Sequence, residues 1–434
     1  MENKVVTRMP PSPTGLFHVG SVRTALYNYL YAKQNKGKFI LRIEDTDNER
    51  SKKEFENNII ESLEWLGMSY EEFYRQSERT EIYKKYLKEL IDKNLAYISK
   101  EEPKEEGEMG EVIRFKNPNK KIKFTDLVLG GIEVDSTDLK DFVIAKDLDT
   151  PLYHFAVVMD DMLMGITHVI RGQDHISNTP RQILILEALQ GVRPKYAHIP
   201  LILSPEKTKL SKRHGAVSAL EYREMGYLPE ALLNFVALIG WNPGSDKEIF
   251  TLDELLKEFS IEKVQKSGGV FNIEKLNWIN KEHIKKLSAS ELKENIFRYL
   301  PDELKIEKII PIIAERISKW GDIKNMLERG ELDLFYKKPV IEKERLIYKN
   351  SSAERIAENL AKAIETLKKL EENNFTAENI KNSLIQIADT LPNRGELLHP
   401  VRYALSGLDK SPDPFIIADI LGKNETLSRL QQAI

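Results

Sequence analysis

The chain opens with an apolar strand that runs into a proline- and glycine-rich loop and then into a helix. The sequence predicts the strand over residues 5–9, the loop over 11–15, and Ser21 as the N-cap of the helix. Behind the cap, apolar side chains recur at helical spacing, at Val22, Leu26, Tyr29 and Leu30. Free N–H groups and the dipole at the start of a helix favour anions. This opening therefore predicts a parallel α/β sheet with an anion site beside its first strand.

The first loop and a distant cationic segment are predicted to meet over one triphosphate. His18 can donate a hydrogen bond to a phosphate, and Gly20 permits close approach. Residues 209–213 carry cations on a loop, which suits the charge that builds on departing pyrophosphate. Taken singly, His18 is equally a turn histidine, and the cations are equally loop charges. Their combination makes His18 and Lys212 the catalytic candidates.

Composition limits the class of protein. A length of 434 residues predicts two to four domains, and 41% hydrophobic with 31% charged residues is typical of a globular protein with an ample core. No apolar run approaches the length of a membrane span, and the N-terminus lacks the apolar core of a signal peptide. The absence of cysteine excludes disulfides and thiolate metal sites, and it fits a reducing cytoplasm.

The charge balance argues only mildly against a nucleic-acid partner. The net charge is −3, but a large protein can confine its basic surface to one face. Any single lysine run is more simply a solvated surface. The candidate basic runs are Lys116 with Lys120, Lys121 and Lys123; Lys281 with Lys285 and Lys286; and Lys337 with Lys338.

The order of predicted elements gives a fold class. Strands and helices alternate over residues 1–85 and 151–213, which predicts a Rossmann-like parallel sheet. The intervening residues 86–150 contain short strand-like pieces and form a small β-rich insertion. These pieces are 112–115, 121–124, 127–129 and 142–144. Residues 214–288 turn helical, and 289–434 are predicted to be all helix, with Ser352 and Thr376 among the helix starts.

Five motifs in one order resemble those of the bacterial-type glutamyl-tRNA synthetases, a family of class I aminoacyl-tRNA synthetases. The resemblance runs from about residue 4 to about residue 290, and more loosely to the end. The motifs are Arg8, Pro11 to Gly15, Leu41 to Asp47, Thr167 to His175, and Lys209 to Gly215.

The resemblance implies roles for the regions and names the partners. It implies a catalytic domain split by an insertion that binds the acceptor end of tRNA at 86–150. A stem-contact region at 214–288 and an anticodon-binding region at 289–434 would follow. The implied partners are tRNA(Glu), ATP with Mg²⁺ and L-glutamate, for a cytoplasmic monomer without a membrane partner. No zinc or other protein-bound metal is expected.

Glutamate needs two cations and one anion in its pocket, because it presents two carboxylates and one ammonium. Arg8 and Arg171 are the candidate cations, since a guanidinium group binds a carboxylate through two parallel hydrogen bonds. Glu44 lies at the end of a strand and can pair with the ammonium, while Ser12 and Tyr153 supply hydroxyls. These five positions match the family's glutamate site. Arg8 is preferred for the side-chain carboxylate, and Arg171 is the alternative.

The resemblance also assigns an ATP site and shows two departures from the family's pattern. Gln173 stands where a glutamate is common, and His154 stands where asparagine is frequent. His154 is predicted to titrate near neutral pH. The implied ATP-binding residues are Pro11, His18, Gly20, Ser21, Asp174, Lys209, Ser211, Lys212 and Arg213.

The implied activity is that of a glutamate–tRNA ligase, which forms glutamyl-adenylate and transfers glutamate to the terminal adenosine of tRNA. Two alternatives remain open: a non-catalytic tRNA-binding paralogue, and a non-discriminating enzyme that also charges tRNA(Gln). A glutaminyl-tRNA synthetase is disfavoured, because its anticodon region is built of β-barrels whereas residues 289–434 are predicted to be helical.

Overall fold

The computed structural model describes residues 4–47, 49–101, 110–208, 210 and 217–434, which divide into two compact units, 1–283 and 284–434. The strands are β1 (Val6–Met9), β2 (Lys38–Ile43), β3 (Glu72–Arg75), β4 (Ala96–Lys100), β5 (Glu111–Phe115), β6 (Lys121–Asp126), β7 (Gly130–Asp135), β8 (Phe142–Ala145), β9 (His168–Gly172), β10 (Lys195–Ile199), β11 (Ile202–Leu203) and β12 (Gly269–Val270). The helices up to the boundary are α1 (Val19–Gln34), α2 (Lys53–Trp65), α3 (Thr80–Asp92), α4 (Tyr153–Leu163), α5 (Thr179–Ala188), α6 (Ala219–Glu224), α7 (Pro229–Leu238), α8 (Leu252–Glu258) and α9 (Ile273–Ile284).

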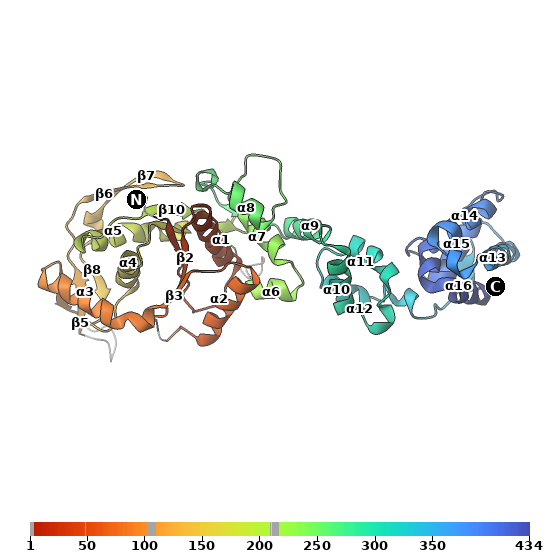
Figure 1. Cartoon of the computed structure of the whole chain (residues 1–434), viewed down its shortest axis with the longest axis horizontal. Coiled ribbons are helices and arrows are strands. Elements are labelled where there is room, and N and C mark those ends of the chain that lie inside the picture. The colour runs from red at the N-terminus through yellow and green to blue at the C-terminus, as the bar shows by residue number, and fades with distance from the viewer. Residues whose placement is uncertain (1–3, 48, 102–109, 209, 211–216) are drawn as a thin grey trace. The chain divides into compact units, whose positions relative to one another are not determined.

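The first unit is built on parallel strands, as the alternation of elements predicts. β1 pairs with β2 and β2 with β3, all in parallel, while β9 pairs in parallel with β10. The two groups meet at β1, where the Thr167 N–H donates to the Val6 carbonyl at 3.0 Å. β2 is buried along nearly its whole length, as is typical of a strand covered on both faces. Helices lie on either side of these strands in Figure 1, and the Rossmann-like fold class is confirmed.

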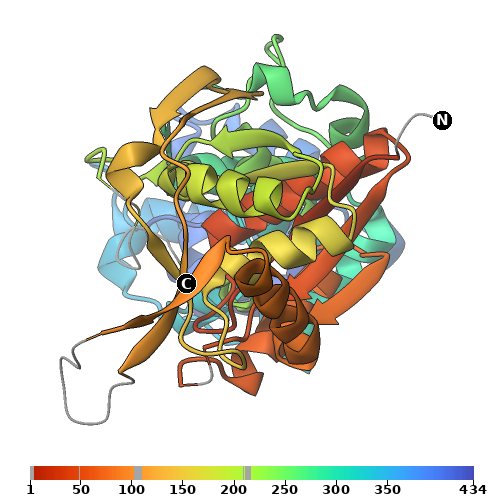
Figure 2. The ribbon, with the colours of Figure 1, turned by 90° about the vertical axis from the view of Figure 1, so that its left-hand side faces the viewer.

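The segment between the two halves of the sheet forms two separate β structures. β4, β5 and β8 make a small antiparallel sheet, whose orange strands lie at one edge of the unit in Figure 2. The β6–β7 hairpin instead extends the main sheet, because Asp126 pairs in parallel with Tyr196 of β10. One edge of the main sheet is therefore formed by β6 and β7, which come from the β-rich segment between the two halves of the sheet.

The strand predicted at residues 127–129 is wrong. These residues form the turn between β6 and β7, and the following glycines begin β7. The Asp126 carboxylate accepts hydrogen bonds from the N–H groups of Val128 and Leu129, both at 2.9 Å, and so bends the chain. Val128 is apolar because it packs into the core of the unit. Because this turn is buried, its residues are apolar, and their composition is the same as that of a short strand.

The second unit is helical, as predicted. All residues from 284 to 434 are described, and their regular elements are helices. Ser352 and Thr376 cap two of these helices, each accepting a hydrogen bond from a backbone N–H three residues on. The helices are α10 (Ala289–Tyr299), α11 (Ile310–Arg316), α12 (Asp322–Glu328), α13 (Ala353–Lys368), α14 (Ala377–Ala388), α15 (Gly395–Ser406) and α16 (Pro414–Gln432).

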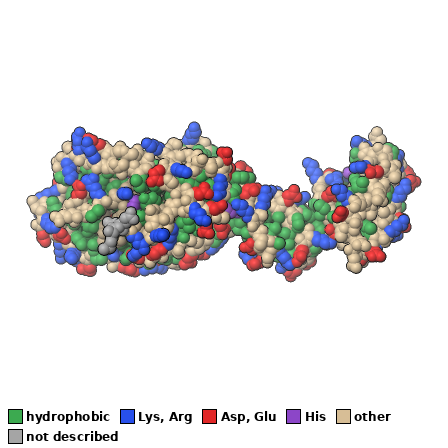
Figure 3. All heavy atoms as spheres, turned by 45° about the horizontal axis from the view of Figure 1, so that its top comes forward, with side chains coloured by type: hydrophobic (Ala, Val, Ile, Leu, Met, Phe, Trp, Pro, Cys, Tyr) green, Lys and Arg blue, Asp and Glu red, His purple; other side chains and the backbone are tan. Residues whose placement is uncertain are grey.

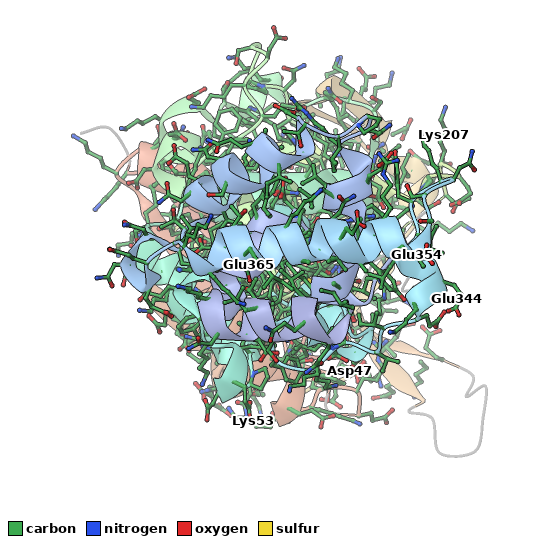
Figure 4. The ribbon with its side chains drawn as sticks, turned by 90° about the vertical axis from the view of Figure 1, so that its right-hand side faces the viewer. Asp47, Lys53, Lys207, Glu344, Glu354 and Glu365 are labelled. Atoms are coloured by element: carbon green, nitrogen blue, oxygen red, sulfur yellow. The ribbon has the colours of Figure 1, made fainter. Side chains whose placement is uncertain are left out.

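Helix α13 shows how an amphipathic pattern fixes packing in the second unit. Its buried face contains Ile356, Leu360 and Ile364 at helical spacing, and it contacts α14, α15 and α16. Glu354 and Glu365 lie on the exposed face of α13, where Figure 4 shows them pointing outward. Among the described residues of the whole chain, no helix is long and apolar enough to cross a membrane.

Leu360→Ala is expected to destabilise the second unit by about 2–5 kcal/mol, because it leaves a cavity at a fully buried position. Amide hydrogen exchange over residues 353–432 in the full-length chain measures the loss. The matched control is Lys362→Ala, which changes an exposed residue of the same helix and should leave protection within about 0.5 kcal/mol. Equal loss in both variants would contradict the assigned packing.

Candidate active site

The first loop lies against the end of the second strand. The Glu44 N–H donates to the carbonyl of Pro11 at 3.0 Å, which brings the loop beside the residue that follows β2. At its other end, the Phe17 N–H donates to the Asn58 side chain at 2.9 Å. Pro11 is buried and Ser12 is exposed between these ties. The loop is therefore held at the carboxyl ends of parallel strands, where open α/β sheets bind ligands.

The prediction that Ser21 caps the first helix is wrong, because His18 is the N-cap. The His18 Nδ1 atom accepts from the N–H groups of Gly20 at 3.1 Å and Ser21 at 3.4 Å. A Cβ atom on Gly20 would lie 3.0–3.1 Å from this ring, so glycine makes room for it. Since Nδ1 accepts, the proton of the neutral ring is on Nε2. His18 thus covers the helix start and presents an N–H donor.

The chain that follows the cationic loop lies beside this histidine. Ser218 forms an antiparallel bridge with His18, and the Ala219 N–H donates to the Phe17 carbonyl at 2.9 Å. On the preceding side, the Leu210 N–H donates to the Ile202 carbonyl at 3.2 Å. The predicted ATP ligands Lys209, Ser211, Lys212 and Arg213 lie outside the described residues. The chain that follows them nevertheless returns to the first loop.

Arg8 is buried in β1, and its partner is a carboxylate that the sequence analysis missed. Its Nε and Nη2 atoms donate to the two oxygens of Asp161 in α4, at 3.1 and 3.3 Å. Asp161 also accepts from Nη1 of Arg42 at 2.7 Å, and Nη2 of Arg42 donates to Glu44 at 2.9 Å. Four charged groups from β1, β2 and α4 thus form one continuous chain.

The charges in this network support one another. Burial opposes ionisation of Arg42, but Asp161, Glu44 and Asp160 outweigh it and raise the pKa of Arg42 above its usual value. Burial likewise opposes ionisation of Asp161, but Arg8 and Arg42 hold its pKa below the ordinary value. Glu44 differs, because burial raises the pKa of its carboxyl despite the neighbouring Arg42.

Arg171 of β9 is buried without a carboxylate contact. Among the described residues it hydrogen-bonds to neutral groups, donating from Nε to His198 at 3.3 Å and from Nη2 to Thr179 at 2.8 Å. Its third nitrogen, Nη1, is buried and has no hydrogen-bond partner in the described part of the chain, and the same holds for Nη1 of Arg8. Buried donors without a partner are uncommon inside proteins, and these two nitrogens are available to acceptors of a ligand.

Tyr153, at the start of α4, shares this environment. Burial raises the pKa of its hydroxyl and the Glu44 carboxylate raises it further, while Arg171 and Arg8 act in the opposite direction. The structure therefore brings together four of the five predicted glutamate-binding residues, and Ser12 is on the adjoining loop. The Tyr153 hydroxyl lies 3.3 Å from Nδ1 of His175.

His154 differs from the sequence prediction, and the position of Asp174 explains the glycine at 172. His154 does not titrate near neutral pH, because burial lowers its pKa to about 4. Asp174 is exposed just after β9, and a Cβ atom on Gly172 would lie 2.4 Å from its carboxylate oxygen. Glycine at 172 therefore lets the Asp174 side chain fold back over the strand end. Gln173 is half-buried at the start of the same turn.

The histidines and acidic residues do not assemble a metal site in the described part of the chain. No group of three His, Cys, Asp or Glu side chains there is arranged to hold an ion. His168, for example, contacts Tyr31 at 3.2 Å and Thr167 at 2.9 Å.

The predicted basic runs are partly neutralised by nearby carboxylates. Lys121 and Lys123 both pair with Glu133, at 3.2 and 2.8 Å. Lys337 pairs with Asp333 at 2.9 Å. Cationic and acidic side chains are interspersed over the face in Figure 3. The face shown in Figure 3 therefore has mixed charge and, among its described residues, no single strongly basic patch.

Family comparisons agree with the motifs. The catalytic-domain model of the class I tRNA synthetases for glutamate and glutamine matches residues 4–111 and 99–278, and the anticodon binding domain model matches 280–434. The chain belongs to the glutamate–tRNA ligase family. It is 38% identical to glutamate–tRNA ligase 1 of Caldanaerobacter subterraneus, with 100% of this chain and 98% of that protein covered. Against glutamate–tRNA ligase 1 of Caldicellulosiruptor saccharolyticus it is 40% identical, covering 99% and 98%.

A solved family member has the same architecture. The crystal structure of a glutamate–tRNA ligase from Elizabethkingia meningosepticum, in complex with its amino acid, matches with a TM-score of 0.89 and 34% identity. The match covers 99% of each chain. The relationship to the family therefore includes the sheet, the segment between its halves and the helical second unit.

Asp161→Asn is expected to lower the free energy of unfolding of the first unit by about 3 kcal/mol, because it leaves two buried guanidinium groups facing an amide. Urea unfolding followed by tryptophan fluorescence measures the difference. Asp149→Asn is the matched control, since the Asp149 side chain is 62% exposed and pairs with Lys84 at the surface. It should cost less than about 1 kcal/mol. A similar cost for both variants would refute the network's role.

Proposed function

We propose that this protein is a glutamate–tRNA ligase that activates L-glutamate with ATP and transfers it to the 3′-terminal adenosine of tRNA(Glu). The α-carboxylate of glutamate attacks the α-phosphate of ATP, which forms glutamyl-adenylate and releases pyrophosphate. The terminal hydroxyl of tRNA then attacks the activated carbonyl, and AMP departs. No side chain has to form a covalent bond to the substrate, so catalysis comes from positioning and charge stabilisation.

The pair of buried guanidinium groups is the observation that carries this proposal. Nη1 of Arg8 and Nη1 of Arg171 each need an acceptor, and glutamate brings two carboxylates. Glu44 offers an anion for the ammonium group, and the hydroxyls of Ser12 and Tyr153 complete the pocket. Which arginine takes the side-chain carboxylate is open. In either assignment the neutral amide of glutamine leaves a buried guanidinium group without its substrate carboxylate, which costs about 2–5 kcal/mol.

The start of α1 supplies the proposed ATP site. Nε2 of His18 can donate to a phosphate, while the N–H groups of Gly20 and Ser21 become available when the ring turns away. Pro11 and Asp174 are proposed to contact the nucleotide, with Asp174 near the ribose. Lys209, Ser211, Lys212 and Arg213 are proposed to close over the phosphates. Lys212 would neutralise charge on the leaving pyrophosphate, and His18 would donate a hydrogen bond to it. Magnesium bound to ATP would supply further charge neutralisation.

The proposed tRNA contacts follow the order of the chain. Residues 86–150 would bind the acceptor end, 214–288 the stem, and 289–434 the anticodon. The match of 280–434 to an anticodon binding domain supports the last of these. We further propose that the protein acts as a monomer in the cytoplasm. The tRNA(Gln) alternative depends on how the second unit discriminates the anticodon.

An aminoacylation assay with glutamate and glutamine against tRNA(Glu) and tRNA(Gln) tests the function. Glutamate should be transferred to tRNA(Glu), and glutamine should react with a kcat/KM lower by about 30-fold to several thousand-fold, which corresponds to 2–5 kcal/mol. Transfer of glutamate to tRNA(Gln) would identify a non-discriminating enzyme. Binding of tRNA without any aminoacylation would instead favour the non-catalytic paralogue.

Lys212→Ala is expected to abolish formation of glutamyl-adenylate while leaving tRNA binding intact, because it removes a cation that stabilises the departing pyrophosphate. ATP–pyrophosphate exchange in the presence of tRNA measures the first property, and filter binding measures the second. Lys266→Ala, which changes an exposed lysine of the same unit, is the control and should retain exchange. Normal exchange in Lys212→Ala would remove the assignment.

A further inference from the structure

The inference concerns what holds Arg171, and it rests on the proposed function. The nitrogen Nε2 of His198 accepts from Nε of Arg171 at 3.3 Å. Thr179 accepts from Nη2 of Arg171 at 2.8 Å and lies 3.0 Å from the same histidine nitrogen. His198 and Thr179 are both fully buried. These contacts occupy two of the three guanidinium nitrogens and leave Nη1 in a fixed direction.

The other side of His198 is fixed by a carboxylate from the β6–β7 hairpin. Nδ1 of His198 lies 2.6 Å from the Oδ2 atom of Asp126. The Oδ1 atom of Asp126 accepts from the backbone N–H groups of Val128 and Leu129, both at 2.9 Å. The His198 N–H is shared between the two carboxylate oxygens, at 3.2 Å from Oδ1 and 3.1 Å from Oδ2. A carboxylate only accepts, so the proton between the two residues is on Nδ1 of His198. Nε2 then has a lone pair, which faces Arg171.

Arg8 provides the contrast within the same pocket. Its Nε and Nη2 atoms bind the carboxylate of Asp161, which neutralises part of its charge. Arg171 is held in the same way through two nitrogens, but by neutral partners. Burial lowers the pKa of His198 below its ordinary value, so the ring stays neutral at pH 7. The negative charge of Asp126 is therefore kept one imidazole ring away from Arg171.

We propose that Asp126 and His198 are positioning residues for Arg171, aiming its free nitrogen at a substrate carboxylate without neutralising the guanidinium charge. The Asp126 carboxylate sets the histidine tautomer, and the tautomer decides whether Nε2 can accept from Arg171. Asp126 also forms the turn of the β6–β7 hairpin. The hairpin turn and the amino-acid pocket thus share one carboxylate.

Asp126→Asn tests the proposal with almost no change in shape. The N–H groups of Val128 and Leu129 keep the amide oxygen at the Oδ1 position, so the NH₂ group takes the Oδ2 position and points at Nδ1 of His198. The histidine must then protonate Nε2, which places an N–H against the N–H of Arg171. In aminoacylation of tRNA(Glu), the KM for glutamate should rise at least tenfold while the KM for ATP stays within twofold.

Two further variants separate positioning from folding. In Asp135→Asn, a matched change in the same hairpin, the KM for glutamate should stay within twofold, because Asp135 hydrogen-bonds to Thr137 within its own turn. In a His198→Gln background, Asp126→Asn should raise the KM for glutamate less than threefold, because an amide side chain can turn to present either its oxygen or its nitrogen. This rescue would not follow if Asp126 only stabilised the fold.

Nitrogen-15 NMR of histidine-labelled protein reads the tautomer without any assay of activity. His198, assigned by loss of its signals in His198→Gln, should have a protonated Nδ1 in the wild type and a protonated Nε2 in Asp126→Asn. An unchanged tautomer overturns the inference, as does an unchanged glutamate KM or an equal rise in the glutamate and ATP KM values. If the wild-type protein does not transfer glutamate to tRNA(Glu), that result would instead contradict the proposed function.

Discussion

The active-site half of the molecule depends on burying positive charge between strand ends without leaving it unsatisfied. Arg8 and Arg42 are fully covered, and a buried guanidinium group is tolerated only when carboxylates or other acceptors surround it. Asp161 binds both arginines, and Glu44 binds Arg42. This arrangement ties β1 and β2 to α4. It also leaves one nitrogen of Arg8 and one of Arg171 for a ligand, so the network that stabilises the site also prepares it for binding.

Much of the fold and of the site was predictable because its determinants are local. Apolar runs bounded by turns gave the parallel strands, and helical spacing behind Ser352 and Thr376 gave helices of the second unit. Arg8, Glu44 and Arg171 stood at ends of predicted strands, where ligands of such sheets bind. The electrostatic effects of Arg8, Glu44 and Arg171 on Tyr153 place all four in one environment.

What escaped prediction depends on contacts between distant residues. Asp161 and Arg42 are 119 positions apart, and neither belongs to a spacing pattern that marks an ion pair. The only local indication was an arginine inside an otherwise apolar strand. The turn at 127–129 was missed because burial made its composition apolar, and the turn is formed by a side chain just before it. His18 was missed as a cap because histidine is not among the usual capping residues.

His18 and His198 of the first unit have opposite tautomers, and in each case the partner of Nδ1 determines which nitrogen is protonated. At His18, Nδ1 faces backbone N–H groups and must accept, so Nε2 becomes a donor, 3.5 Å from the Ser21 hydroxyl. At His198, Nδ1 faces the Asp126 carboxylate and must donate, so Nε2 becomes an acceptor for Arg171. A donor suits a phosphate, and an acceptor suits a guanidinium group. Histidine can therefore serve the proposed ATP site as a donor and the proposed glutamate site as an acceptor, because the groups around Nδ1 determine which nitrogen is protonated.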